Sequence, residues 1–86
     1  MMWRDGVVTG TRTAWGPAGR SCAELDVEIV GAPSNADGLL PGQRVRAVAY
    51  EALTGLPDVA ERVRLEVSAL DRALGTGGHA MVSARL

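Results

Sequence analysis

The sequence predicts a small all-β fold, a barrel of five to six strands of the SH3-like or OB-like kind, with at most one or two short helical turns. Apolar and polar residues alternate in several short runs, as expected when one face of a strand meets a core and the other meets water. Glycine and proline separate these runs, and five short strands with such turns fit a sheet that curls to remove its edges. With 86 residues, we expect one domain, residues 1–86.

The first predicted strand covers about Val7 to Thr13, where valine and threonine favour extended backbone. Trp15 to Gly19 reads Trp-Gly-Pro-Ala-Gly. This segment predicts a turn, because proline restricts φ while glycine tolerates unusual conformations.

The second predicted strand, Ala23 to Val30, has the clearest alternation in the chain. Leu25, Val27 and Ile29 face one way, and three carboxylates face the other way: Glu24, Asp26 and Glu28. The segment from Gly31 to Gly42 is rich in Pro, Ser, Asn, Asp and Gly. It predicts a long loop and the most mobile region of the chain.

The third predicted strand runs from Gln43 to Ala49, with Arg44, Arg46 and Val48 on its outer face. Val48 and Tyr50 make that face partly apolar, so this strand is a candidate for cover on both sides. One helical turn is predicted over Tyr50 to Leu53, and Pro57 could open a second turn that continues to Ala60.

The last two predicted strands run from Arg62 to Leu70 and from Ala80 to Arg85. Leu74 to Gly78 reads Leu-Gly-Thr-Gly-Gly and lies between them. Three glycines in four positions let the backbone reach positive φ, so this segment predicts a hairpin or a longer loop between neighbouring strands.

The composition indicates a thin core. Phe is absent and the aromatic residues are Trp3, Trp15 and Tyr50, so the interior volume must come from Val, Leu, Ile and Ala. Because each buried branched aliphatic side chain contributes only about 1.5–3 kcal/mol, self-association is a plausible source of extra burial.

Charge and cysteine content exclude some classes of function. All nine cations are Arg, and ten acidic residues give a net charge of −1. This balance argues against a protein whose main function is to bind the nucleic-acid backbone. One cysteine, Cys22, excludes an internal disulfide and a cysteine-rich metal site. The start has no apolar signal segment, and no run approaches the ~20 apolar residues of a membrane helix. We therefore expect a cytoplasmic protein that contacts no membrane.

The second half of the chain resembles a known family. The segment RVRAVAYEALTGLPDVAERVRLEVSALDRALGTGGHAMV is similar to the N-terminal region of an uncharacterised bacterial family of unknown function, whose most specific piece is an LGTGGYALVV-type segment. Gly6 to Thr9, Trp15-Gly16 and Glu24 to Glu28 extend the resemblance over nearly the whole chain. Here Ala60-Glu61 replaces the family's Gly-Asp, Glu66 its Asn, and His79 its Tyr. The resemblance implies a much longer C-terminal region in that family and supplies no catalytic residue.

Two candidate sites involve the last third of the chain. The loop of Gly75, Thr76, Gly77 and Gly78 could cradle an anion with its backbone N–H groups. It lacks the Lys-Ser/Thr ending of a phosphate loop, so a turn is the simpler interpretation. His79 and Cys22 could form a nucleophilic pair, although no family signature surrounds Cys22, and His79 is more simply a strand residue beside the turn.

Charged strand faces give the remaining candidates. Glu24, Asp26 and Glu28 share one face, and the opposite charge is offered by Arg44, Arg46, Arg62 and Arg64. If the acidic strand lies beside an Arg strand, each cross-strand pair contributes a few tenths of a kcal/mol to about 1 kcal/mol. The alternative is an Arg patch for an acidic partner.

These patterns support a non-catalytic barrel that acts by self-assembly or protein–protein binding and needs no cofactor or metal. Val48, Tyr50 and Met81 are its interface candidates. A nucleic-acid-binding barrel is the alternative, with phosphates on the Arg face and bases stacked on Tyr50 or Trp15. An enzyme using His79 and Cys22 is a third possibility without an identifiable substrate.

Overall fold

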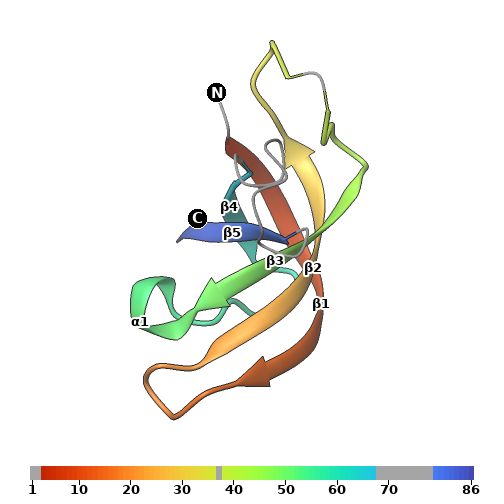
Figure 1. The fold of residues 1–86 in the computed structure, drawn as a ribbon. Helices are drawn as coiled ribbons and strands as arrows, with labels where there is room; N and C mark the ends of the chain where they lie inside the picture. The colour runs from red at the N-terminus through yellow and green to blue at the C-terminus, as the bar shows by residue number, and fades with distance from the viewer. Residues whose placement is uncertain (1–2, 37, 68–78) are drawn as a thin grey trace.

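The computed structural model describes residues 3–36, 38–67 and 79–86. Their elements, in chain order, are β1 (Trp3–Trp15), β2 (Cys22–Gly31), β3 (Arg44–Tyr50), α1 (Glu51–Thr54), β4 (Arg62–Glu66) and β5 (His79–Arg85) (Figure 1). The strands form a closed barrel in the order β1-β2-β3-β5-β4, and β4 pairs with β1 to complete the ring. The predicted all-β barrel is therefore confirmed.

The strand order selects the OB-like form of the barrel over the SH3-like form. β3 and β5 pair in parallel, whereas the other neighbouring strands are antiparallel. A simple meander has only antiparallel neighbours, but here β4 leaves β3 and pairs instead with β5 and β1. The only helix of the described residues, α1, lies between β3 and β4 in the chain, as in the five-stranded Greek-key barrel of OB-folds.

Most element bounds agree with the sequence pattern, and β1 is the main extension. β1 starts at Trp3 rather than near Val7, and the buried positions along its first half alternate: Arg4, Gly6 and Val8. The sequence hid this start because an arginine and a glycine occupy inward positions. β4 ends at Glu66, and Val67 is buried but lies beyond the strand. The rest of the predicted continuation to Leu70, and the glycine segment from Leu74 to Gly78, lie outside the described residues.

Of the two predicted helical turns, the first is confirmed as α1 and the second is wrong. After Pro57 the backbone forms a hydrogen-bonded turn with Ala60 at φ 74°. The N–H of Ala60 donates to the carbonyl of Val8 at 2.7 Å, and the N–H of Val8 donates to the carbonyl of Glu61 at 3.0 Å. These bonds to β1 replace the bonds that a helix would make.

The barrel interior is aliphatic, as the composition predicts. Trp15 and Tyr50 are exposed, and Trp3 is only half-buried. The buried hydrophobic residues are Val8, Ala23, Leu25, Val27, Ile29, Ala47, Ala49, Val63, Leu65, Val67, Ala80 and Val82. Four alanines among them keep the interior narrow, so a closed barrel of only five strands can be filled without large rings.

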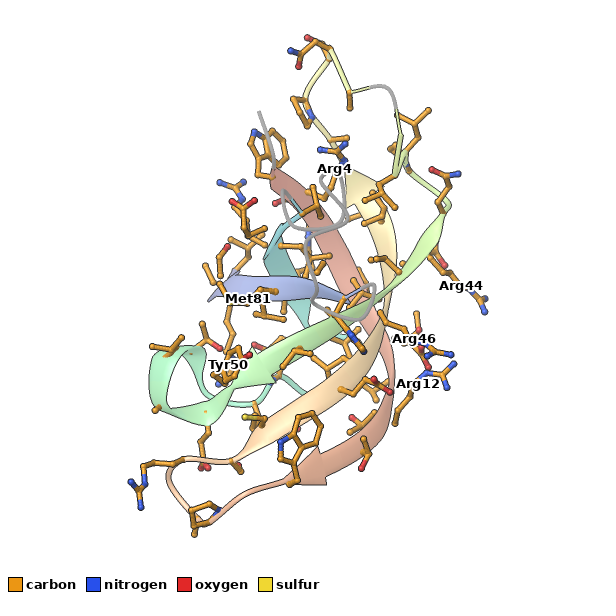
Figure 2. The ribbon with its side chains drawn as sticks, viewed as in Figure 1. Arg4, Arg12, Arg44, Arg46, Tyr50 and Met81 are labelled. Carbon is orange, nitrogen blue, oxygen red and sulfur yellow. The ribbon has the colours of Figure 1, made fainter. Side chains whose placement is uncertain are left out.

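A buried arginine ties the long β2–β3 connection to the barrel. Arg4 is 3% exposed, and its guanidinium donates to the carbonyls of Gly38 at 2.7 Å and Leu39 at 3.0 Å (Figure 2). It also donates to the carbonyl of Trp3 at 2.8 Å. The loop that the sequence marks as most mobile is thus anchored at its second half by a charge-assisted network.

Candidate functional site

The register of the barrel places outward residues of β1, β2, β3 and β5 in four successive rows, which we call the outer face. The rows are Trp15, Cys22 and Tyr50; then Thr13, Glu24, Val48 and Met81; then Gly10, Asp26, Arg46 and His79; then Val7, Glu28 and Arg44. Because side chains of one row are cross-strand neighbours, each row is a unit of contact. The face changes from apolar in the first rows to charged in the last.

The apolar end of the outer face consists of Trp15, Cys22, Val48, Tyr50 and Met81. Trp15 is 50% exposed, Met81 40% and Tyr50 38%. The sequence predicted Val48, Tyr50 and Met81 as interface candidates. The structure brings these three together and adds Trp15 and Cys22 from neighbouring strands.

A carboxylate clamp holds this end in place. Oε1 of Glu51 accepts hydrogen bonds from the Ser21 hydroxyl at 2.7 Å, the Gly19 N–H at 2.9 Å and the Ser21 N–H at 3.2 Å. The pKa of the Glu51 carboxyl is lowered from its ordinary value, mainly by the hydrogen bond from the Ser21 hydroxyl and next by the bond from the Ser21 N–H. Since Ser21 precedes Cys22 and Glu51 follows Tyr50, the clamp joins the β1–β2 turn to the start of α1 beside the first row.

The charged end of the outer face contains a pocket of about 520 Å³, which we call the arginine pocket. Its lining residues are Thr9, Arg12, Asp26, Arg44, Val45 and Arg46. Figure 2 shows Arg12, Arg44 and Arg46 gathered on one side of the barrel, away from Tyr50 and Met81. Arg12 is the residue of this cluster that the sequence pattern missed.

The three arginines of the arginine pocket differ in their contacts. The Nε of Arg12 donates to Oδ1 of Asp26 at 2.8 Å, and this hydrogen bond raises the pKa of the Arg12 guanidinium. Asp26 lies opposite Arg46 and Glu28 opposite Arg44 in the β2–β3 register, so the acidic strand does lie beside an Arg strand. Nevertheless, among the described residues neither Arg44 nor Arg46 forms an ion pair.

The centre of the outer face holds the histidine. His79 begins β5 opposite Arg46, and its Nε2 contacts Oε2 of Glu24 on β2. Cys22 lies in the first row, opposite Tyr50, whereas His79 lies in the third row. The structure therefore assigns His79 to a carboxylate contact and places Cys22 at the apolar end of the face.

The other two predicted arginines lie on a different part of the barrel. Arg64 forms a bidentate contact with Asp5, at 2.8 and 3.2 Å, and its guanidinium lies 4.8 Å from the centre of the Trp3 ring. Arg62 is opposite Val7 of β1, so Val7 of β1 and Glu28 of β2 lie between it and Arg44 along the fourth row. The four arginines do not form one patch. Gly75, Thr76, Gly77 and Gly78 lie outside the described residues.

One sequence signal could have revealed Arg12. The run from Thr9 to Thr13 breaks the alternation of β1, because polar residues and glycine follow one another without an apolar residue. Such a break in a strand indicates a β-bulge, and bulges redirect side chains. The expected alternation obscured this signal.

In the described part of the chain, no three His, Cys, Asp or Glu side chains are grouped as metal ligands, and no helix is long and apolar enough to cross a bilayer. Fold and face together define the protein as an OB-like barrel with an exposed face that is apolar at one end and arginine-rich at the other.

Comparison with known proteins adds a family likeness. Residues 46–86 match a family described as "Protein of unknown function (DUF3866)". This match supports the resemblance to an uncharacterised family over the second half of the chain, and it includes β3 from Arg46 onward, α1, β4 and β5. No curated protein and no solved structure matches the chain.

Proposed function

We propose that this chain is a protein-contact module and that its outer face binds a second copy of the chain. The observation that carries the proposal is the apolar end, where Trp15, Tyr50 and Met81 lie in adjacent rows and remain 38–50% exposed. Aromatic residues, methionine and arginine are enriched at the centres of protein interfaces. A typical interface covers about 800 Å² on each partner, roughly one sixth of the 4921 Å² surface of this protein.

The layout of β3 favours a second copy over an unrelated partner. Arg46 and Tyr50 lie on the same face of the strand, each two residues from Val48. A two-fold axis that crosses β3 at Val48 would place each Arg46 against Tyr50 of the other copy. Two reciprocal cation–π contacts would then flank an apolar centre, which is the self-complementarity that a two-fold interface requires.

The test is the solution mass of the purified chain, measured by analytical ultracentrifugation across a range of concentrations. We expect a reversible dimer, and Tyr50→Glu should raise its dissociation constant by about 30-fold or more, as for an interface hot spot. Val59→Glu is the matched control, because Val59 is 57% exposed but lies in the α1–β4 connection. A monomer at every concentration, or equal effects of the two variants, would contradict the proposal.

Binding of single-stranded nucleic acid is the second candidate. It is favoured by the presence of Trp15, Tyr50 and three arginines on one face of an OB-like barrel, the face that such folds use for oligonucleotides. The carboxylates of β2 oppose it, because Glu24, Asp26 and Glu28 lie along the middle of that face. We therefore rank it second.

Fluorescence anisotropy with a labelled oligothymidylate would test the second candidate. Binding should weaken steeply with salt, and it should be lost in Arg46→Glu but kept in Arg62→Glu, since Arg62 lies on β4, outside the outer face. An affinity that does not change with ionic strength would contradict this function.

A further inference from the structure

Two β-bulges in β1 produce the arginine pocket. In the β1–β2 register Val8 pairs with Val27 and Gly10 with Asp26, so Thr9 is left without a partner. Thr11 pairs with Leu25 and Thr13 with Glu24, so Arg12 likewise has no opposite residue in the β1–β2 register. A bulge redirects the extra side chain and bends the strand. Both extra residues line the arginine pocket.

The bulges add hydrogen-bond donors to the lining of the pocket. Arg12 adds a third guanidinium to those of Arg44 and Arg46, and Thr9 adds a hydroxyl that donates to the carbonyl of Asp26 at 3.2 Å. Among the lining residues, three guanidinium groups face one carboxylate, so the lining carries an excess of two positive charges. The pairing of Arg12 with Asp26 holds that guanidinium at the pocket.

We infer that the arginine pocket is a binding site for a phosphate group carried by a small polar molecule. The excess of two positive charges matches a dianion, and the tetrahedral oxygens of a phosphate can accept from several guanidinium groups at once. A carboxylate has one charge and two oxygens, so it leaves part of this donor set unused. This site goes beyond self-association. It shares Arg46 with the proposed dimer contact, but Thr9, Arg12 and Arg44 are not part of that contact.

The dimensions and the surroundings of the arginine pocket define the rest of the ligand. At about 520 Å³ it falls within the range of small-molecule sites and exceeds the volume of a bare phosphate ion. Val45 is its only apolar lining residue, so the remainder of the ligand should be polar, such as a sugar phosphate or a diphosphate. A long polynucleotide fits less well, because Glu24 lies one row further along β2.

The test is an NMR titration of the ¹⁵N-labelled chain at constant ionic strength with inorganic phosphate, pyrophosphate, ribose 5-phosphate and an oligothymidylate. We expect saturable shifts of the Thr9–Thr13 and Arg44–Arg46 amides, with ribose 5-phosphate and pyrophosphate tighter than inorganic phosphate. Arg12→Gln should weaken binding roughly tenfold or more, as expected for a charge-assisted contact. Arg62→Gln, the same change at an exposed arginine outside the pocket, should leave affinity unchanged.

Further variants keep the test decisive. Arg44→Gln should weaken binding as Arg12→Gln does, and because Arg44 is exposed and forms no ion pair within the described residues, its loss should not affect folding. Tyr50→Glu should bind phosphate normally even when it no longer dimerises, which separates this site from the proposed function. Equal losses of phosphate affinity in Arg12→Gln and Arg62→Gln would overturn the inference. Affinity for the oligothymidylate that grows with its length would also overturn it and favour nucleic acid.

Discussion

Two strands of this barrel contain the same tripeptide, Arg-Val-Arg, with opposite consequences. In β4, Arg62-Val63-Arg64 has a fully buried valine, and Arg64 is engaged by Asp5 and the Trp3 ring. In β3, Arg44-Val45-Arg46 has a half-buried valine, and within the described residues its arginines form no ion pair. The difference shows that a local pattern assigns a side chain to a face, whereas the neighbouring strand decides whether it is used for stability.

The largest expected effect concerns two glycines of β1: Gly6 lies beside β4, and Gly10 lies in the row that contains Arg46. Gly6 pairs with Val63, and a Cβ there would lie 2.3 Å from Cγ1 of Val27 and 3.0 Å from the Glu28 carbonyl oxygen. Gly6→Ala should therefore lower the free energy of unfolding by about 3 kcal/mol. Gly10 lies opposite Asp26 and has room for a Cβ, whose nearest contact would be 3.8 Å away. In urea titrations, Gly10→Ala should be nearly neutral, and equal losses would refute this account of β1.

The next effect compares the two valines. Val63 is 0% exposed, so Val63→Ala removes buried methyl groups and leaves a cavity, and it should cost about 2 kcal/mol. Val45→Ala should cost about 1 kcal/mol or less, because Val45 packs at the edge of the core and is only partly buried. Chemical denaturation of both variants measures the difference, and a larger loss at Val45 would show that the arginine pocket contributes to the core.

The free energy of unfolding should depend on pH in the acid range partly through Glu61, the residue before β4. The pKa of the Glu61 carboxyl is lowered from its ordinary value of 4.5. The main cause is the hydrogen bond from Arg85 of β5, and the bond from the Asp58 N–H is the second. A carboxyl whose pKa is lowered by folding stabilises the fold above its unfolded pKa and loses that contribution as the pH falls through its folded pKa. Unfolding stability should thus decline below about pH 4.5, and less steeply in Glu61→Gln.

Two results would clarify the role of Glu61. Arg85→Gln should weaken the same acid dependence, since it removes the main cause of the lowered pKa. Combining the two substitutions should add little to either one. An unchanged pH profile in Glu61→Gln would assign the acid sensitivity to other carboxylates.

The smallest effect separates the two outward arginines. Arg64→Gln removes the bidentate contact with Asp5 and the guanidinium above Trp3, so it should lower the urea midpoint modestly and shift the indole N–H resonance of Trp3. At concentrations where the chain is monomeric, Arg46→Gln should leave both readouts unchanged while weakening phosphate binding at the arginine pocket. A loss of stability in Arg46→Gln as large as in Arg64→Gln would erase the distinction between the two strands.

The sequence pattern predicted much of the fold and only part of the candidate site. The strands at β2 and β3 followed directly from alternation, because one side of each faces an aliphatic core and the other faces solvent. Arg44, Arg46 and Tyr50 were recognised as outward residues for the same reason. Arg12 was missed because a bulge, not alternation, directs it. The predicted helical turn after Pro57 failed because Ala60 and Glu61 bond to β1 instead.

By itself the sequence determined that this chain forms a small β-barrel with an aliphatic interior, since period-two alternation and turn residues act locally, and Val, Leu, Ile and Ala were the only material for a core. The tertiary structure alone decided the parallel pairing of β3 with β5, and with it the OB-like order. It also decided that Trp15, Tyr50 and Met81 share one end of a face, and that Arg12 joins Arg44 and Arg46 rather than Arg62 or Arg64. The reason is physical: register and bulges are set by pairing between strands far apart in the chain, which no single run of residues specifies.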